Sequence, residues 1–253
     1  MTHRYDNREA FIRWMEDNPD RMDDDLPVSE VFGPTIQGEG PHAGRPCWFI
    51  RLGGCNLSCT WCDTPYSTGQ HGIPLSTIPR RSVEGALRTI PAQSLVVLTG
   101  GEPLMHAKRP GFTTLLYMLQ ARGCEVHVET NGTIAPPLVL ADLIDHYTVS
   151  PKLGVEMVKR SHRPTLADWS GLADRVAFKF VVDSDDADAA ARHSITIAAE
   201  CGVPPRRVWL MPEGATAEAL ADKWRPVAEA AARAGINASH RLHALAWGDA
   251  KGH

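Results

Sequence analysis

The chain has 253 residues, of which 43% are hydrophobic and 22% are charged, as in an ordinary soluble globular protein that buries a full core. Its formal net charge of -4 at pH 7 argues against a nucleic-acid surface, which usually carries a basic stripe. The sequence shows neither an apolar run of membrane-spanning length nor an apolar signal region after Met1. We therefore expect a cytoplasmic protein with no nucleic-acid or membrane partner, in a compartment where clustered cysteines bind metals.

The order of apolar and amphipathic segments predicts one α/β domain. Residues 1–26, with the acidic run Asp23–Asp25, are expected to form an N-terminal extension to a domain of residues 27–253. The predicted strands are Trp48–Leu52, Leu95–Leu98, Glu125–Val128, Tyr147–Val149, Val176–Val182, Val208–Leu210 and Arg241–Leu245. The predicted helices between them are Val83–Ile90, Gly111–Arg122, Pro137–Asp145, Asp185–Cys201 and Ala217–Ala234. This alternation predicts a parallel sheet with fewer than the eight strands of a closed barrel, that is, an incomplete, splayed TIM-like barrel.

Turn residues support these boundaries. Ser82 is a suitable N-cap for the first predicted helix, and Gly123 and Gly235 are suitable ends for two others. The segment Tyr66–Pro79 is rich in Gly, Pro, Ser and Thr and is predicted to be a loop.

Polar or Gly/Pro clusters follow most of the predicted strands. They are Gly53-Gly54, Thr99–Pro103, Glu129–Gly132, Ser150–Lys152 and Met211–Glu213. In parallel α/β folds, chemistry is found at the carboxyl ends of the strands, so these clusters predict a site along one rim. Gly100-Gly101-Glu102 offers a closely approachable backbone and a carboxylate, which suits an amino-group ligand, although an ordinary strand-to-helix turn has the same composition.

Three cysteines, Cys55, Cys59 and Cys62, follow the first predicted strand with the spacing C-x3-C-x2-C. A structural zinc site takes four protein ligands and an iron–sulfur cube usually takes four cysteines. Three thiolates on one loop fit a 4Fe–4S cube with one iron open to a small molecule. A zinc site, with His71 or Cys47 as the fourth ligand, is the alternative.

The cysteine loop followed by Gly101-Glu102-Pro103 resembles the radical S-adenosylmethionine (SAM) superfamily. The resemblance implies that residues 27–253 form a catalytic domain in which the three cysteines hold a 4Fe–4S cluster whose open iron binds SAM. Reduction of the cluster then cleaves SAM to a radical that abstracts a hydrogen atom. The residues that match SAM contacts are Trp61, Cys62, Asp63, Gly101, Glu102, Ser150, Pro151, Lys152, Met211 and Pro212.

The segment Ser29–Gly40 narrows the resemblance to one family. It is similar to the opening of the 7-carboxy-7-deazaguanine synthases (the QueE family), which read E-x-F-x-S-I-Q-G-E-G, with Thr35 here where serine is usual. The match is best over residues 28–152 and continues more loosely through Met211-Pro212 and His240–His243. It implies the ring contraction of 6-carboxy-5,6,7,8-tetrahydropterin to 7-carboxy-7-deazaguanine with loss of ammonia.

The same resemblance assigns the substrate end of the site. Its implied substrate-binding residues are Ile36, Gln37, Gly38, Glu39, Arg51, Thr99 and His243. Glu39 is expected to pair with pterin N–H donors, and the rigid donor fork of Arg51 with an anionic or carbonyl group, a surface ion pair being the alternative for Arg51. His243 is expected over the substrate or, equally, at a surface strand end. Thr64 matches the Mg2+ ligand of the family, although one hydroxyl is a weak ligand that needs substrate oxygens and waters beside it.

Partners follow from the resemblance alone. It implies a pterin substrate, an external, flavodoxin-like electron donor and a homodimer. A glycyl-radical-enzyme activase, which shares the cluster and SAM, and a non-catalytic zinc-binding module are the alternative functions. The sequence does not indicate whether the product is used for tRNA, DNA or a natural product.

Overall fold

The computed structural model describes residues 25–60, 62–69, 73–152, 166–183 and 185–248, together with positions 13, 16, 250 and 252. Almost all of the predicted extension 1–26, as well as Trp61 and His71, therefore lie outside the described residues. Within the described ranges, no helix is long and apolar enough to cross a membrane.

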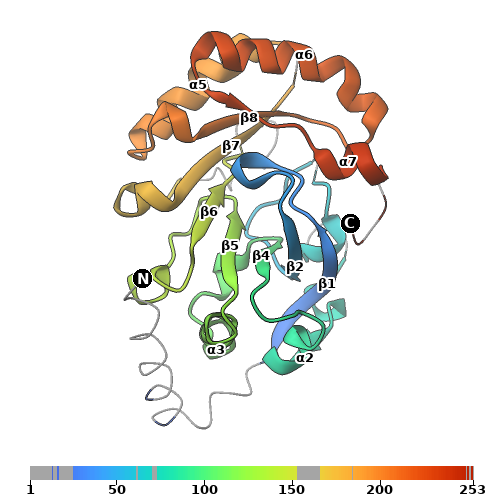
Figure 1. The fold of residues 1–253 in the computed structure, drawn as a ribbon, viewed down its shortest axis with the longest axis vertical. Helices are drawn as coiled ribbons and strands as arrows, with labels where there is room; N and C mark the ends of the chain where they lie inside the picture. Colours follow the sequence, from blue (N-terminus) through green and yellow to red (C-terminus); the bar gives the residue numbers. More distant parts are fainter. Residues whose placement is uncertain are drawn as a thin grey trace.

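The described residues form one nine-stranded sheet with the order β3-β1-β2-β4-β5-β6-β7-β8-β9 (Figure 1). Its strands are β1 (Leu26–Ile36), β2 (Pro46–Leu52), β3 (Arg80–Arg81), β4 (Leu95–Gly100), β5 (Glu125–Thr130), β6 (His146–Val149), β7 (Val176–Val182), β8 (Val208–Pro212) and β9 (Asn237–Ala238). The strands from β2 to β9 in this order pair in parallel, whereas β1 pairs antiparallel with both β2 and β3. Because β3 and β9 are the two edges, the sheet is unclosed, and the predicted splayed barrel is confirmed.

Helices cover the outer face of the sheet (Figure 1). The described helices are α2 (Val83–Leu87), α3 (Pro110–Ala121), α4 (Leu138–Ala141), α5 (Ala187–Glu200), α6 (Ala217–Ala234) and α7 (Leu242–Trp247). Unlike the others, α7 packs beside the end of β1, where the Leu242 amide donates to the Gly38 carbonyl. Short 3-10 turns are η2 (Gly40–His42), η3 (Pro65–Ser67), η4 (Leu75–Thr77), η5 (Pro103–His106), η7 (Ser170–Arg175) and η8 (Pro205–Arg207). On α3, Phe112, Leu115 and Leu119 recur at helical spacing and are all buried in the main core against the sheet.

Most of the predicted helices and strands are present, although α4 has only four residues where Pro137–Asp145 was expected and α2 ends at Leu87, before the expected Ile90. The helix expected at Ala217–Ala234 has those bounds and ends at Gly235, which adopts the left-handed conformation that glycine tolerates best. Ser82 caps α2 by accepting a hydrogen bond from the Gly85 amide. The first six predicted strands correspond to β2 and β4–β8.

Two predictions at the ends of the sheet were wrong. The strand expected at Arg241–Leu245 is the start of α7, and the last strand is the two-residue β9. Five residues are too few to distinguish a strand from a helix by periodicity, and Leu and Ala favour the helix. The strand β1 was missed because Gly33 and Pro34 interrupt its pattern, at a shift in its register with β2. A bulged, antiparallel edge region is where a strand tolerates such residues.

The amino ends of the strands hold a buried cluster of three imidazoles, here termed the basal histidine cluster. The rings of His127 on β5 and His146 on β6 lie 5.2 Å apart, and His42 of η2 lies 4.3 and 4.4 Å from them. Glu125 accepts a hydrogen bond from His127 and forms an ion pair with Arg45. The buried Nε2 atoms of His42 and His146 have no hydrogen-bond partner. Burial, together with the nearby cationic groups, lowers the pKa of His146 from 6.5 to about 2.

The basal histidine cluster predicts a loss of stability in mild acid. His146 takes up a proton near pH 6.5 in the unfolded chain, whereas it stays neutral at that pH in the folded protein. Its contribution to the free energy of unfolding is therefore fully present above pH 6.5 and decreases as the pH falls below 6.5. One such group contributes a slope of about 1.4 kcal/mol per pH unit. His146→Phe should flatten the fall in unfolding free energy between pH 6.5 and 4.5, as measured by urea denaturation of the cluster-free protein.

His193→Phe, at an exposed position of α5, is the matched control. An unchanged slope in His146→Phe would contradict the assignment.

Candidate active site

A cavity of about 430 Å3 opens at the carboxyl ends of the parallel strands. It brings together most of the residues predicted from the sequence. Those that line it are Ile36, Gln37, Gly38, Glu39, Arg51, Cys62, Asp63, Thr64, Thr99, Gly101, Ser150, Lys152, Met211 and His243. Cys55, Cys59, Glu102, Pro151 and Pro212 are not among the lining residues, and Trp61 lies outside the described residues.

The cysteine loop forms one end of this cavity. The side chains of Cys55 and Cys62 pack against buried Cys59 and Leu57 in a small cluster of their own. Burial raises the pKa of Cys55 to about 11 and also raises the pKa of Cys59. These thiols are therefore protonated when no metal is bound, and a metal must displace their protons.

Gly100 and Gly101 are needed where β4 passes under the cysteine loop. A Cβ on Gly100 would lie 2.0 Å from the Leu52 carbonyl oxygen, and one on Gly101 would lie 2.1 Å from the Gly54 carbonyl oxygen. The amides of Gly101 and Glu102 donate to these same two carbonyls, at 3.1 and 2.7 Å respectively. The two glycines thus fix the base of the cysteine loop directly against the end of β4.

The carboxylate of Glu102 is fully buried and engaged by the protein. It accepts hydrogen bonds from the amides of Leu104 and Asn131 and from the Thr130 hydroxyl. Burial nevertheless raises its pKa to about 7. Its predicted contact with SAM stays a prediction, but these bonds show that the side chain organises the wall behind Gly101.

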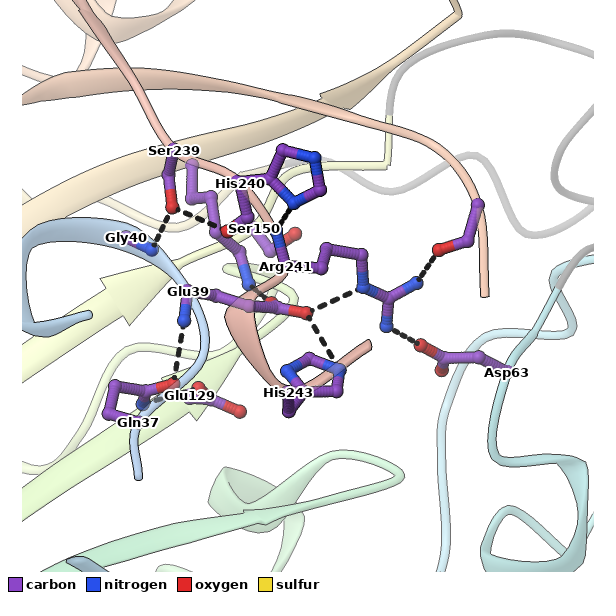
Figure 2. Close-up of polar contacts among 12 residues, drawn as sticks. Gln37, Glu39, Gly40, Asp63, Glu129, Ser150, Ser239, His240, Arg241 and His243 are labelled. Carbon is purple, nitrogen blue, oxygen red and sulfur yellow. Dashed lines mark hydrogen bonds and ion pairs between the residues drawn. The ribbon is translucent and has the colours of Figure 1, made fainter. Parts of the chain in front are cut away.

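A charged network centred on Glu39 crosses the cavity (Figure 2). Its carboxylate pairs with Lys179 of β7, accepts a 2.9 Å hydrogen bond from Arg241 Nε and lies 3.9 Å from His243 Nε2. Burial alone would raise the pKa of Glu39, but these three groups hold it well below its usual range. Arg241 also bonds Asp63 beside the cysteine loop at 2.8 Å. Both oxygens of Glu39 are therefore already paired within the protein.

Glu129 is the second carboxylate of the cavity. It accepts hydrogen bonds from Gln37 Nε2 at 3.0 Å and from the Thr99 hydroxyl at 2.9 Å. The sequence places Glu129 at a strand end, but no motif indicates a role for it. Nor does any motif indicate Lys179, which lies in an apolar run, or Arg241, which lies in a segment predicted to be a strand.

Gly38 and His243 are in close contact across the cavity wall. A Cβ at position 38 would lie 2.0 Å from Nδ1 of His243, and the Leu242 amide donates to the Gly38 carbonyl at 2.9 Å. The side chain of His243 lines the cavity, whereas the neighbouring His240 packs its ring against Trp224. Of the two alternatives for His243, its position favours a role in the site.

Arg51 and Thr64 both line the cavity. Arg51 donates from Nε to Glu30 at 3.1 Å, with 15% of its side chain exposed, so it is both an ion-pair partner and part of the cavity wall. The Thr64 hydroxyl lies 3.9 Å from Cys62 Sγ. Lys152 donates to the Ser150 hydroxyl at 3.1 Å in the loop after β6.

The ligand set fits a cluster better than a single metal ion. Among the described residues, no three His, Cys, Asp or Glu side chains converge as ligands of one ion. In a cube each cysteine binds a different iron, so its thiolates need not meet at one point. Cys47, an alternative fourth ligand for zinc, packs with Phe49, Leu95 and Val97 instead of with the cysteine loop.

Comparison with known proteins agrees with this site. A model of the Radical SAM superfamily matches residues 49–176. The chain is 37% identical over 233 residues to 7-carboxy-7-deazaguanine synthase from Pyrobaculum aerophilum, which covers 89% of this chain and 96% of that protein. It is 37% identical over 226 residues to the enzyme of the same name from Hyperthermus butylicus, covering 87% and 92%. The crystal structure of QueE from Escherichia coli matches with a TM-score of 0.59 and 26% identity, covering 87% and 95%.

The fold, the cysteine loop and the matching family model define a radical SAM protein, a class that uses a 4Fe–4S cluster and SAM. The identity to relatives over nearly their whole length is more specific. The chain belongs to the 7-carboxy-7-deazaguanine synthase family. Membership of this family decides against the two alternative functions, a glycyl-radical-enzyme activase and a non-catalytic zinc-binding module.

The contact between Gly38 and His243 predicts that substitutions at these two positions have coupled effects on the free energy of unfolding. Gly38→Ala should destabilise the protein by about 1–3 kcal/mol, because the new methyl group forces the imidazole or the backbone to move. In a His243→Ala background the same change should cost much less. Urea denaturation of the four combinations measures the coupling. An equal cost in both backgrounds would show that the two positions are independent.

Proposed function

We propose that the chain catalyses the ring contraction of 6-carboxy-5,6,7,8-tetrahydropterin to 7-carboxy-7-deazaguanine with release of ammonia, and is thus a carbon–nitrogen lyase. One observation carries the proposal: the cysteine loop and the Gln37–Glu39 segment line a single cavity. The family of the chain and the names of its relatives support the same reaction.

At the cofactor end, Cys55, Cys59 and Cys62 would hold the cluster. Cys62 lines the cavity, whereas Cys59 is buried behind it, so the loop would present the cluster to the cavity from one side. Bound SAM and the reduced cluster supply the radical that abstracts a hydrogen atom from the substrate.

The remaining cofactor contacts would come from the rim of strand-end loops. The lining residues Asp63, Gly101, Ser150, Lys152 and Met211 would face SAM. Lys152 is a cation suited to the methionine carboxylate, and its bond to Ser150 orients it.

At the substrate end, the contacts of Glu39 support a role other than the expected one. Two cations, Lys179 and Arg241, pair with the carboxylate of Glu39, whereas the hydrogen-bond partners of Glu129 are the uncharged side chains of Gln37 and Thr99. We propose that Glu39 positions these two cations and that Glu129 accepts the pterin N–H donors. Gln37 and Thr99 each hold one oxygen of Glu129 and so fix the plane of its carboxylate. Arg51 would bind an anionic or carbonyl group of the substrate.

The reaction also requires an electron from outside the chain. A flavodoxin-like donor, a homodimer and a cytoplasmic location follow from the resemblance and stay predictions.

Anaerobic turnover tests the proposed function. The cluster-reconstituted protein, given a reductant, SAM, Mg2+ and the tetrahydropterin, should form a deazapurine detectable by mass and ultraviolet absorption. Cys59→Ala should abolish the brown cluster absorption and the product together. A reduced, cluster-loaded protein that forms no deazapurine would defeat the proposal.

A role for Thr64 in magnesium binding is tested separately. Thr64→Ala should raise the Mg2+ concentration for half-maximal activity about tenfold, the scale on which a lost supporting group weakens a metal site. The visible spectrum of the cluster should not change. Thr77→Ala, which removes an exposed hydroxyl bonded to Pro74, is the control. An unaltered magnesium response would remove Thr64 from the metal site.

A further inference from the structure

One guanidinium joins three separate segments around the cavity. Arg241 donates from Nε to Glu39 at 2.9 Å, from Nη1 to the Gly214 carbonyl at 2.6 Å and from Nη2 to Asp63 at 2.8 Å. Only 13% of its side chain is exposed. Figure 2 shows it between Glu39 and Asp63, with a different nitrogen of the guanidinium directed at each.

The three segments belong to different parts of the site. Asp63 directly follows Cys62 of the cysteine loop, and Glu39 directly follows Gln37-Gly38 at the substrate end. Gly214 lies in the loop after β8 and also lines the cavity. The planar guanidinium holds all its donors in fixed directions, so it fixes the mutual positions of these three segments.

Because Asp63 is exposed, its ion pair with Arg241 is expected to affect the position of the cysteine loop more than the stability of the whole protein. The Asp63 side chain is 56% exposed, and ion pairs with such an exposed partner contribute little to folding free energy. The Asp63–Arg241 bond nevertheless connects the cysteine loop to the buried Glu39 network. Its effect should therefore appear in the order of the loop more than in global stability.

We propose that Arg241 is a positioning residue that sets the cysteine loop against the substrate end of the cavity through Asp63 and Glu39. The proposal rests on the proposed function, because it concerns the distance between the SAM and pterin ends. Correct spacing would keep each SAM cleavage coupled to hydrogen abstraction from the substrate.

The contact between Arg241 and Asp63 is disrupted by one substitution at each of the two residues. Arg241→Lys keeps the positive charge beside Glu39, but one ammonium cannot span all three acceptors. Asp63→Asn removes the charge of the exposed partner. Because Asp63 would also face SAM, hydrogen exchange measured without SAM is the readout that reports the contact with Arg241 alone. Arg233→Lys is the matched control, because Arg233 forms a similar two-pronged ion pair with Asp188 of α5 outside the cavity lining.

Three measurements are made on each full-length protein. Amide hydrogen exchange of the cluster-free protein reports the order of residues 55–64. The electron paramagnetic resonance signal of the reduced cluster, titrated with SAM, reports SAM affinity. Anaerobic turnover gives the ratio of released 5′-deoxyadenosine to deazapurine product.

We expect Arg241→Lys and Asp63→Asn each to speed exchange in residues 55–64. Each should weaken SAM binding about tenfold, as for one lost charge-assisted hydrogen bond, and raise the 5′-deoxyadenosine-to-product ratio. The double variant should be no worse than Arg241→Lys alone, because both changes cut one link. Arg233→Lys should match the wild type.

Wild-type hydrogen exchange of residues 55–64 in Asp63→Asn would overturn the proposal whatever the SAM affinity, as would fully additive effects in the double variant. Should Arg241→Lys fail to fold, Asp63→Asn decides alone. A wild-type protein that makes no deazapurine would refute the proposed function instead, and exchange and SAM affinity would still decide the role of Arg241.

Discussion

The pairing of one largely buried carboxylate, that of Glu39, with cations from distant segments determines how this site is assembled. A buried charge is tolerated only when it is paired, and losing one partner of such a pair costs about 3–5 kcal/mol. Glu39 follows β1, while its partners Lys179 and Arg241 come from β7 and from the segment before α7. The edges of the described sheet, β3 and β9, do not pair, and this network joins the first and last parts of the splayed barrel beside the cavity, together with the Gly38–Leu242 and Gly40–Ser239 hydrogen bonds.

The two ends of the barrel use ionisable groups in opposite ways. At the carboxyl ends of the strands, charges of opposite sign surround Glu39 and keep it ionised. At the amino ends, burial holds His42 and His146 in their neutral forms. The cavity end can therefore orient charged ligands by fixed charges, whereas the basal end contributes packing that is sensitive to acid.

The sequence predicted the parts of this structure that depend on local pattern. The buried parallel strand β4 begins with a continuous apolar run, Leu95–Leu98, and the cysteine spacing identifies the cofactor loop without any tertiary information. The prediction failed where tertiary context decides, as at Arg241–Leu245, where the expected strand is the start of α7. Glu39 has the right chemistry for a ligand contact, and only the fold shows that Lys179, 140 residues away, pairs with it. Likewise, the need for glycine at position 101 comes from the Gly54 backbone as well as from any ligand.

The sequence separation of these contacts has a consequence for biosynthesis. Arg241 bonds Glu39 across 202 residues, and the Gly40 amide bonds the Ser239 hydroxyl across 199. Contacts this distant form only after most of the chain exists, since their loop-closure cost must be met first. A ribosome-bound chain that still lacks Arg241 would contain the cysteine loop without the hydrogen bonds of Arg241 to Asp63 and Glu39. Insertion of the iron–sulfur cluster and completion of the cavity can therefore be separate events in time.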